Sequence, residues 1–176
     1  MLGLIRGTVI LEAHQASWRQ IAGETVSCLK RLLGETAVDV QHVGSTAIRG
    51  IRAKPIIDIA VAVRDLEDIK PHIEDLEQHG IHYRREDVAE QLLFVIGEGE
   101  YRTHHIHVVK WQADAWNDYL NFRDYLNTYP EKAKSYETLK IKLAAEFCND
   151  RANYTSGKQE LICRLLEEAR LWREHG

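Results

Sequence analysis

The segment Pro55–Val63, PIIDIAVAV, constrains this chain more than any other, because it has the pattern of a nearly continuous apolar strand. The only charge inside it is Asp58. A carboxylate buried in an apolar strand is tolerated only when it is paired with an opposite charge or bound to a metal ion. The alternative is that Asp58 merely ends the strand. The segment therefore predicts a buried strand that carries one candidate functional residue.

Helical and extended patterns alternate around this strand, and we expect residues 1–110 to form an α/β core. Gly97–Glu100 is expected to be a hairpin turn. The other expected elements are a helix from about Ala16 to Leu33 that ends at Gly34, a strand over Ala37–Val43, a helix from about Lys70 to His79 with Pro71 in its first turn, and strands over Ile81–Arg84, Gln91–Ile96 and Tyr101–Lys110.

From Trp111 onward the apolar residues recur with a helical period. Thr128–Glu131, TYPE, has the pattern of a capping box with Pro130 in the first turn of the next helix. We expect Trp18, Trp116 and Trp172 to pack in the core. Residues 111–176 are thus predicted to be a C-terminal helical extension packed on the core in a single compact domain of the α+β class.

Composition excludes several function classes. Charged residues make up 28% of the 176 residues and the formal net charge is -4, so we expect no binding to long nucleic acids. The three cysteines, Cys28, Cys148 and Cys163, form no metal or redox pair and are expected to be buried thiols in a reducing compartment. The first residues do not resemble a signal peptide and no stretch of 18 apolar residues occurs, which predicts a cytoplasmic protein without a membrane partner.

Gly44 and Ser45 follow the expected strand Ala37–Val43 and precede Asp58 by a short loop. A Gly-Ser turn after a strand frees backbone N–H groups and a hydroxyl to hold phosphate oxygens, because glycine lets a ligand approach the backbone closely. A carboxylate on the neighbouring strand can then hold a divalent cation that bridges the phosphates. A lone Gly-Ser pair is more often only a turn, but the carboxylate in the next strand favours a phosphate site.

Five segments occur in this order along the chain: HVGSTAIRGIRAKPIIDI, RTHHIHVV, LNFRDYL, YETLK and YTSGK. Together they resemble the GrpB family, which belongs by fold to the nucleotidyltransferase superfamily of DNA polymerase β. The resemblance extends from about Val9 to Glu168, and it implies a nucleotidyltransferase-like mixed sheet with flanking helices and a helical cap. Related domains occur fused to dephospho-coenzyme A kinase, which implies an accessory role near coenzyme A metabolism.

The superfamily pattern implies that Gly44, Ser45 and Thr46 bind phosphate and that Asp58 is the first metal ligand, with Ser45 and Asp58 as the catalytic pair. The second carboxylate should stand at position 60, where this chain has Ala60. Two carboxylates at i and i+2 face the same side of a strand and let two Mg²⁺ ions clamp the reacting oxygens. The loss of one weakens the case for polymerase-like chemistry.

The later strand of the pattern carries histidines where a third carboxylate is expected. By strand alternation His105 and His107 share one face, and His104 lies on the other. With Asp58 and His42 they are candidate ligands of a divalent metal, and this donor set suits Mn²⁺, Zn²⁺, Ni²⁺ or Fe²⁺ better than Mg²⁺. The alternative is that they are hydrogen-bonded core histidines.

Four basic residues are candidates for binding the phosphates of a nucleotide: Lys54, Arg123, Lys140 and Lys158. Lys54 precedes the Asp58 strand. Lys140 and Lys158 each follow a tyrosine by four residues, which predicts that each pair shares a helical face, and the resemblance places this tail over the cleft. The alternative is that they are ordinary solvated charges.

The leading hypothesis is a protein that binds a nucleotide or another phosphorylated small molecule and catalyses metal-dependent nucleotidyl or phosphoryl transfer. The attacking group would belong to the acceptor, so the protein needs no nucleophile of its own. The first alternative is a non-catalytic accessory module that has lost the second carboxylate, and Ala60 favours it. The second is metal-dependent hydrolysis at a His-Asp site. The fold does not decide among these.

Overall fold

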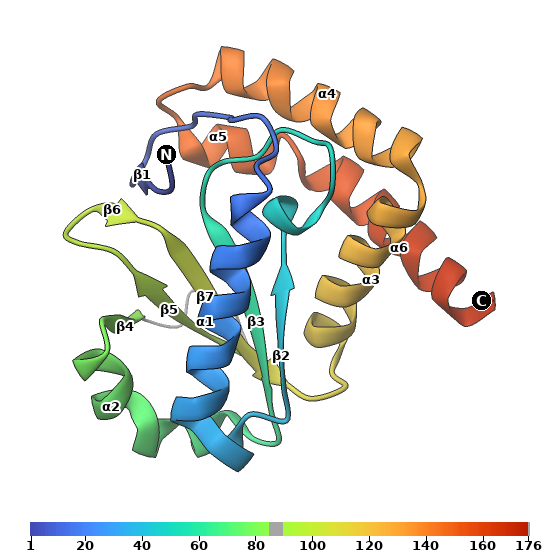
Figure 1. Cartoon of the computed structure of the whole chain (residues 1–176). Coiled ribbons are helices and arrows are strands. Elements are labelled where there is room, and N and C mark those ends of the chain that lie inside the picture. The colour runs from blue at the N-terminus through green and yellow to red at the C-terminus, as the bar shows by residue number, and fades with distance from the viewer. Residues whose placement is uncertain (85–89, 176) are drawn as a thin grey trace.

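The computed structural model describes residues 1–84 and 90–175. Its centre is a five-stranded mixed sheet in the order β2-β3-β7-β5-β4 (Figure 1). Strands β3 and β7 are parallel, and the other neighbours are antiparallel. The strands are β2 (Asp39–Val43), β3 (Ile57–Val63), β4 (Ile81–Arg84), β5 (Gln91–Ile96) and β7 (His104–Lys110).

Strand β3 is covered on both faces, which explains its continuous apolar sequence. Ile57, Ile59, Val61 and Val63 pack on one face, whereas Ala60 and Ala62 pack on the other. Asp58 shares the face of the two alanines. The alanines leave room there for α3 (Asp114–Thr128), which packs Trp116 against them.

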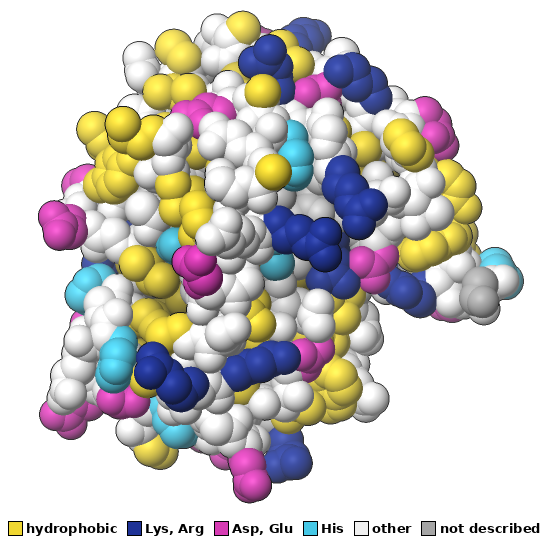
Figure 2. Space-filling model, viewed as in Figure 1, with side chains coloured by type: hydrophobic (Ala, Val, Ile, Leu, Met, Phe, Trp, Pro, Cys, Tyr) yellow, Lys and Arg dark blue, Asp and Glu magenta, His cyan; other side chains and the backbone are white. Residues whose placement is uncertain are grey.

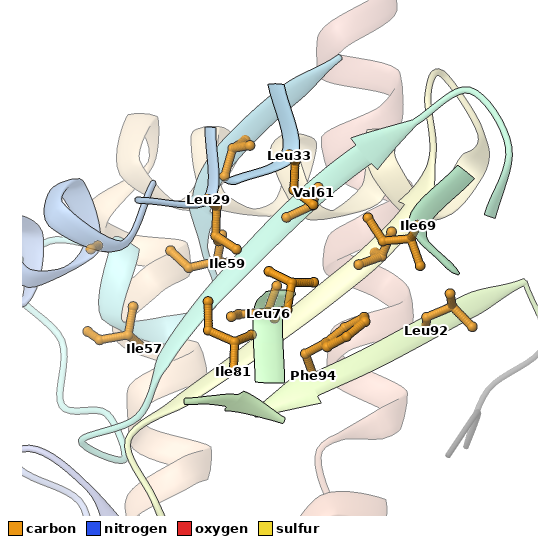
Figure 3. Close-up of a cluster of buried hydrophobic side chains, with 14 of the residues drawn as sticks. Leu29, Leu33, Ile57, Ile59, Val61, Ile69, Leu76, Ile81, Leu92 and Phe94 are labelled. Atoms are coloured by element: carbon orange, nitrogen blue, oxygen red, sulfur yellow. The ribbon is translucent and has the colours of Figure 1, made fainter. Parts of the chain in front are cut away.

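The main core lies between the helices and the face of the sheet that carries Ile57, Ile59 and Val61 (Figure 3). Helix α1 (Ser17–Leu33) contributes Trp18, Leu29 and Leu33, and α2 (Ile73–Gln78) contributes Leu76. Burying each of these side chains contributes about 1.5 to 3 kcal/mol. Figure 2 views the molecule from the α1 side and shows basic and acidic side chains interspersed over that face.

The C-terminal helices form a cap beside the other face of the sheet (Figure 1). A second apolar cluster joins Ile48 and Ile51, in the loop after Gly44, to Tyr125, Tyr136 and Leu165 of the cap. Arg170 donates two hydrogen bonds to Asp118, at 2.8 and 2.6 Å, and so links the last helix to α3. After α3 the cap consists of α4 (Pro130–Glu146), α5 (Arg151–Ser156) and α6 (Gln159–His175).

The N-terminal segment connects the core to the cap. Its strand β1 (Leu4–Ile5) pairs with β6 (Tyr101–Arg102). The backbone N–H of Val9 donates to the carbonyl of Cys148 at 2.9 Å, and Glu12 forms a β-bridge with Ala53. The segment therefore runs along the loop that leads into β3.

The α+β class is confirmed, and the expected strands form except that Tyr101–Lys110 is divided into β6, which pairs with β1, and β7. Four further local predictions are wrong. Pro71 lies inside the 3₁₀ helix η3 (Leu66–His72), which precedes α2 and was not expected. The hydroxyl of Thr128 donates to the carbonyl of Asp124 in its own helix, so it forms no capping box. Tyr154 and Lys158 do not share a helix, because α5 ends at Ser156. The cysteines are not buried: Cys148 and Cys163 are exposed and Cys28 is half-buried. Among the described residues, no helix has the length and apolar character needed to cross a bilayer.

Candidate functional site

A cleft of about 590 Å³ opens on the α3 face of the sheet, between the ends of β3 and β7 and the helical cap. Its floor includes Gly44, Ser45, Asp58, His105 and His107. The helices supply the opposite wall: Tyr119 and Phe122 from α3, Tyr136 from α4, Tyr154 from α5, and Ile162 and Leu166 from α6. The structure thus brings together residues that are far apart in the sequence.

Two features require glycine at position 44: its backbone conformation and the closeness of Asp58. Its φ is 71° and its ψ is -171°, a region that is essentially restricted to glycine. A Cβ atom at this position would lie 2.5 Å from Oδ2 of Asp58 and 2.9 Å from its Cβ. The Gly-Ser turn therefore lies directly against the carboxylate. Oγ of Ser45 lies 3.4 Å from the hydroxyl of Tyr136, at the edge of the cap.

Asp58, His105 and His107 form the only group of three candidate metal ligands found in residues 1–84 and 90–175. The parallel register pairs Asp58 with His105 and Ala60 with His107. Nδ1 of His105 lies 3.4 Å and Nε2 of His107 3.2 Å from the same carboxylate oxygen, Oδ1. One ligand atom from each residue lies within 4.8 Å of the others.

Asp58 is held in its ionised form. Burial by itself raises the pKa of this carboxyl group, but the hydrogen bonds that His105 and His107 donate to it outweigh burial. The net effect places the pKa of Asp58 well below its ordinary value. A permanent carboxylate with two imidazoles beside it is an arrangement that a divalent cation can occupy.

His42 lies outside this group, contrary to the prediction that it is a metal ligand, and Thr46, which was predicted to bind phosphate, does not line the cleft. His42 pairs with Ile59 across β2 and β3, so its side chain lies on the face opposite to Asp58. Its Nε2 lies 2.9 Å from Oγ1 of Thr46, which is only 2% exposed. Burial lowers the pKa of His42 to about 4, which keeps the ring neutral. His104 lies on the same opposite face, as expected, and contacts Thr25 of α1 at 3.1 Å.

Three basic side chains line the cleft: Lys54, Arg151 and Lys158. Within the described part of the chain, none of them has a carboxylate at ion-pair distance. Lys54 and Lys158 approach the same ring, that of Tyr154, with Nζ at 5.6 and 4.4 Å from its centre. Burial and the charge of Lys54 lower the pKa of Lys158 to about 8, and burial and Arg151 lower that of Lys54. A negatively charged ligand would relieve this repulsion.

Arg123 and Lys140 have structural contacts instead, contrary to the prediction that they bind phosphate. Arg123 donates to Oε1 of Gln41 at 2.9 Å and to the carbonyl of His42 at 3.0 Å, and so braces β2. Lys140 is 1% exposed and donates to the carbonyl of Arg52 at 2.5 Å. Neither residue lines the cleft. Lys140 shares a helical face with Tyr136, as the spacing predicts, and its Nζ lies 4.6 Å from that ring.

Comparison with known proteins identifies the family. The family model described as GrpB protein matches residues 8–168. The chain belongs to the GrpB family. It is 41% identical to the glutamate-rich protein GrpB of Alkalihalophilus pseudofirmus, over 96% of this chain and 99% of that protein. It is 34% identical to UPF0157 protein YqkA of Bacillus subtilis, over 92% of this chain and 47% of that protein.

Solved structures agree with the family. GrpB from Enterococcus faecalis superimposes with a TM-score of 0.86 at 30% identity, over 93% of this chain and 99% of that one. The Cid1 poly(U) polymerase superimposes with a TM-score of 0.52 at 14% identity, over 76% of this chain and 44% of that one. At such low identity the second likeness shows the fold alone. This GrpB chain therefore has a nucleotidyltransferase-like fold.

The residues of this GrpB site fit one metal ion better than two. Ala60 cannot supply the second carboxylate of the superfamily pattern, and the residue beside it on β7 is His107. Two imidazoles and one carboxylate on one side of a cleft form a set that leaves coordination positions open, as in single-ion sites of Fe²⁺ or Mn²⁺. Zn²⁺ accepts the same donors. A pair of Mg²⁺ ions, which prefer oxygen ligands, does not fit.

Three residues that line the cleft of this GrpB chain were not predicted from its sequence: Gln91, Tyr119 and Arg151. Gln91 begins β5 and Tyr119 lies on α3, so only the packing of α3 on the sheet brings them together. Arg151 begins a short helix and follows no charge pattern. The alternation of β5 implies the face on which Gln91 lies, but only once the pairing of β5 with β7 is known.

Proposed function

We propose that this GrpB protein binds a nucleotide or another phosphorylated small molecule in the cleft and transfers its nucleotidyl or phosphoryl group with the help of one divalent transition metal ion. One observation supports this most: a group of three candidate metal ligands lies in the same cleft as three basic side chains that have no carboxylate at ion-pair distance within residues 1–84 and 90–175. A bound anion would neutralise the basic side chains, and a bound cation would neutralise the carboxylate of Asp58.

In this proposal Lys54, Arg151 and Lys158 hold phosphate oxygens through charge-assisted hydrogen bonds, each contributing about 1.5 to 3 kcal/mol. The backbone around Gly44 and the hydroxyl of Ser45 hold a further phosphate oxygen beside Asp58. Asp58, His105 and His107 would hold the metal ion, which supplies a positive charge at the reacting phosphorus. The acceptor supplies the attacking oxygen, so the chain's own residues bind and orient.

The structural neighbours support a nucleotide as the ligand. One Cid1 structure is described as bound to MgGTP and as revealing a mechanism for UTP selectivity. The wall of Phe122, Tyr136, Ile162 and Leu166 in the present cleft offers an apolar surface for a base. In this proposal the site holds one metal ion, so the chemistry differs from that of enzymes that depend on two Mg²⁺ ions.

A second candidate function is a non-catalytic binding module, with a role beside coenzyme A metabolism as its expected setting. Ala60 is the observation that favours it, because the strand lacks the second carboxylate of the transfer enzymes. This candidate predicts the same phosphate binding without turnover.

Calorimetric titration tests the proposal. We expect Mn²⁺ or Zn²⁺ to bind the wild type and not Asp58→Asn. Inorganic triphosphate and ATP should bind about tenfold more weakly to Lys158→Met. Lys142→Met, which removes an exposed lysine of α4 outside the cleft, is the matched control and should bind like the wild type.

Turnover separates the two candidates. Release of pyrophosphate or phosphate from ATP in the presence of Mn²⁺, lost in Asp58→Asn, supports transfer chemistry. Binding without release supports the binding module. Equal affinity of Lys158→Met and the wild type for triphosphate contradicts the placement of the phosphates.

A further inference from the structure

Two residues behind His107 form a short hydrogen-bond chain. Gln91 lies on the cleft face of β5, and its side-chain amide nitrogen lies 3.1 Å from Nδ1 of His107. The hydroxyl of Tyr119 donates to the amide oxygen of Gln91 at 2.9 Å. The ring of Tyr119 also packs against the imidazole of His107, with 5.2 Å between the ring centres. The chain therefore runs from the helical cap through β5 to a candidate metal ligand.

The direction of this chain determines which nitrogen of His107 carries the proton. In the amide orientation of this structure the nitrogen of Gln91 donates, so Nδ1 of His107 accepts. The neutral ring then has its proton on Nε2, the nitrogen that lies 3.2 Å from Oδ1 of Asp58. This tautomer donates to Asp58 and offers no lone pair at Nε2. It is the tautomer of a site without a metal ion.

A metal ion beside Asp58 requires the opposite tautomer, because it binds the lone pair of Nε2 and leaves the proton on Nδ1. Metal-bound histidines nearly always donate that second N–H to a carbonyl, a carboxylate or water. Gln91 can accept it if its amide turns over and presents Oε1 to Nδ1. Its nitrogen then points to Tyr119, whose hydroxyl oxygen can accept as well as donate.

This reversal has a consequence inside the cleft. Once the oxygen of Tyr119 accepts from Gln91, its own proton is free to donate elsewhere, and Tyr119 lines the cleft. A tyrosine hydroxyl carries its proton at neutral pH and can both donate and accept. A phosphate oxygen of a bound ligand is a suitable acceptor for that proton.

We infer that Gln91 and Tyr119 are positioning residues that set the tautomer of His107, so that metal binding reverses their hydrogen-bond chain and turns the Tyr119 hydroxyl toward a phosphorylated ligand. The metal site of the proposed function is a premise of this inference. The reversal makes metal binding and phosphate binding cooperative, because each favours the same orientation of the chain.

The tautomer is measured by ¹⁵N NMR of the histidine rings. We expect the proton of His107 on Nε2 in the metal-free wild type and on Nδ1 after Zn²⁺ is added. In Gln91→Glu the carboxylate can only accept, so Nδ1 should carry a proton even without a metal ion, whether or not Nε2 also carries one. A proton on Nδ1 in the metal-free wild type would overturn the inference.

Metal affinity gives a second measurement, by competition with a fluorescent Zn²⁺ chelator. Gln91→Leu should weaken Zn²⁺ binding by about 10- to 100-fold, as loss of such partners does in other metal sites. Gln91→Glu should bind at least as tightly as the wild type. Gln159→Leu is the matched control, because Gln159 lines the same cleft and bonds Cys163 rather than a histidine. It should bind like the wild type.

Tyr119→Phe tests the link to the ligand. It should bind Zn²⁺ within about threefold of the wild type, because the positioning carbonyl of Gln91 remains. The increase in triphosphate affinity on addition of Zn²⁺ should become smaller in this variant. If Asp58→Asn loses Zn²⁺ and Gln91→Leu keeps full affinity, this inference alone is overturned. A wild type that binds neither Mn²⁺ nor Zn²⁺ overturns the metal site of the proposed function as well.

Discussion

Replacing Gly44 by alanine should damage both the fold and the site, and the structure gives the size of the effect. A residue with a side chain in this backbone region costs about 1 to 3 kcal/mol. The new Cβ would lie 2.5 Å from Oδ2 of Asp58, so either the turn or the carboxylate must move. Such overpacking costs a further ~1 to 3 kcal/mol. We therefore expect Gly44→Ala to lose roughly 2 to 6 kcal/mol of unfolding free energy.

Gly80→Ala is the matched control. Gly80 has a φ of 74°, close to the 71° of Gly44, but a Cβ there would meet nothing within 4 Å. It should lose only the backbone cost, about 1 to 2 kcal/mol. Urea unfolding measures both variants, and with a slope of about 1 to 3 kcal/mol per molar urea the difference is resolved.

Metal titration of the same two variants tests the link to the site. Gly44→Ala should bind Mn²⁺ at least about tenfold more weakly because Asp58 is displaced, and Gly80→Ala should bind normally. The reasoning fails if the two variants unfold at the same urea concentration and bind Mn²⁺ equally well. That result would mean that the turn moves away from Asp58 at no cost.

Three other substitutions test residues that were predicted to belong to the site and that lie outside it in the structure. Burial lowers the pKa of Lys140 to about 7, so between pH 7 and pH 10 the ammonium proton is bound in the unfolded chain and absent in the folded one. The unfolding free energy should therefore rise with pH in that window, and in urea unfolding the rise should be up to ~3 kcal/mol larger in the wild type than in Lys140→Met. Arg123→Met should lose about 2 to 3 kcal/mol in the same assay while triphosphate affinity by calorimetry stays unchanged. Because burial lowers the pKa of His42 to about 4, the unfolding free energy should decrease as the pH drops from 6.5 to 4, and this decrease should be ~2 kcal/mol smaller in His42→Gln. Equal pH profiles of the variant and the wild type would contradict the buried neutral ring.

Local patterns predict the fold well, because they report burial directly. The apolar run of β3 is covered on both faces, and the alternation in β7 places His105 and His107 on the face opposite to His104. The failures occur where one local pattern is compatible with two hydrogen-bond arrangements. Thr128 has a capping pattern, yet its hydroxyl bonds the carbonyl of Asp124.

The candidate site also contains some residues whose positions the sequence predicts and others whose positions it does not. The structure brings Gly44 and Ser45 beside Asp58, at the end of adjacent strands, as the strand-turn-strand order implies. His42 is misplaced by the sequence alone, because its face relative to Asp58 depends on the register of β2 against β3. Lys140 has the expected spacing from Tyr136, but spacing does not tell whether a helix turns a face to a cleft or to a loop.

The register of β3 against β7 explains how the site can lack one carboxylate and still hold a metal ion. In the superfamily pattern two acids at i and i+2 share one strand, and here the i and i+2 pair stands on the neighbouring strand as His105 and His107. The face and the spacing are kept, but the ligand set has a single negative charge from Asp58. A bound divalent ion therefore keeps one net positive charge, and Lys54, Arg151 and Lys158 add to it across the cleft. Such a cleft matches the several negative charges of a polyphosphate better than it matches a singly charged ligand. In the proposed function, the metal ion and the basic side chains of the wall would therefore neutralise the phosphates together.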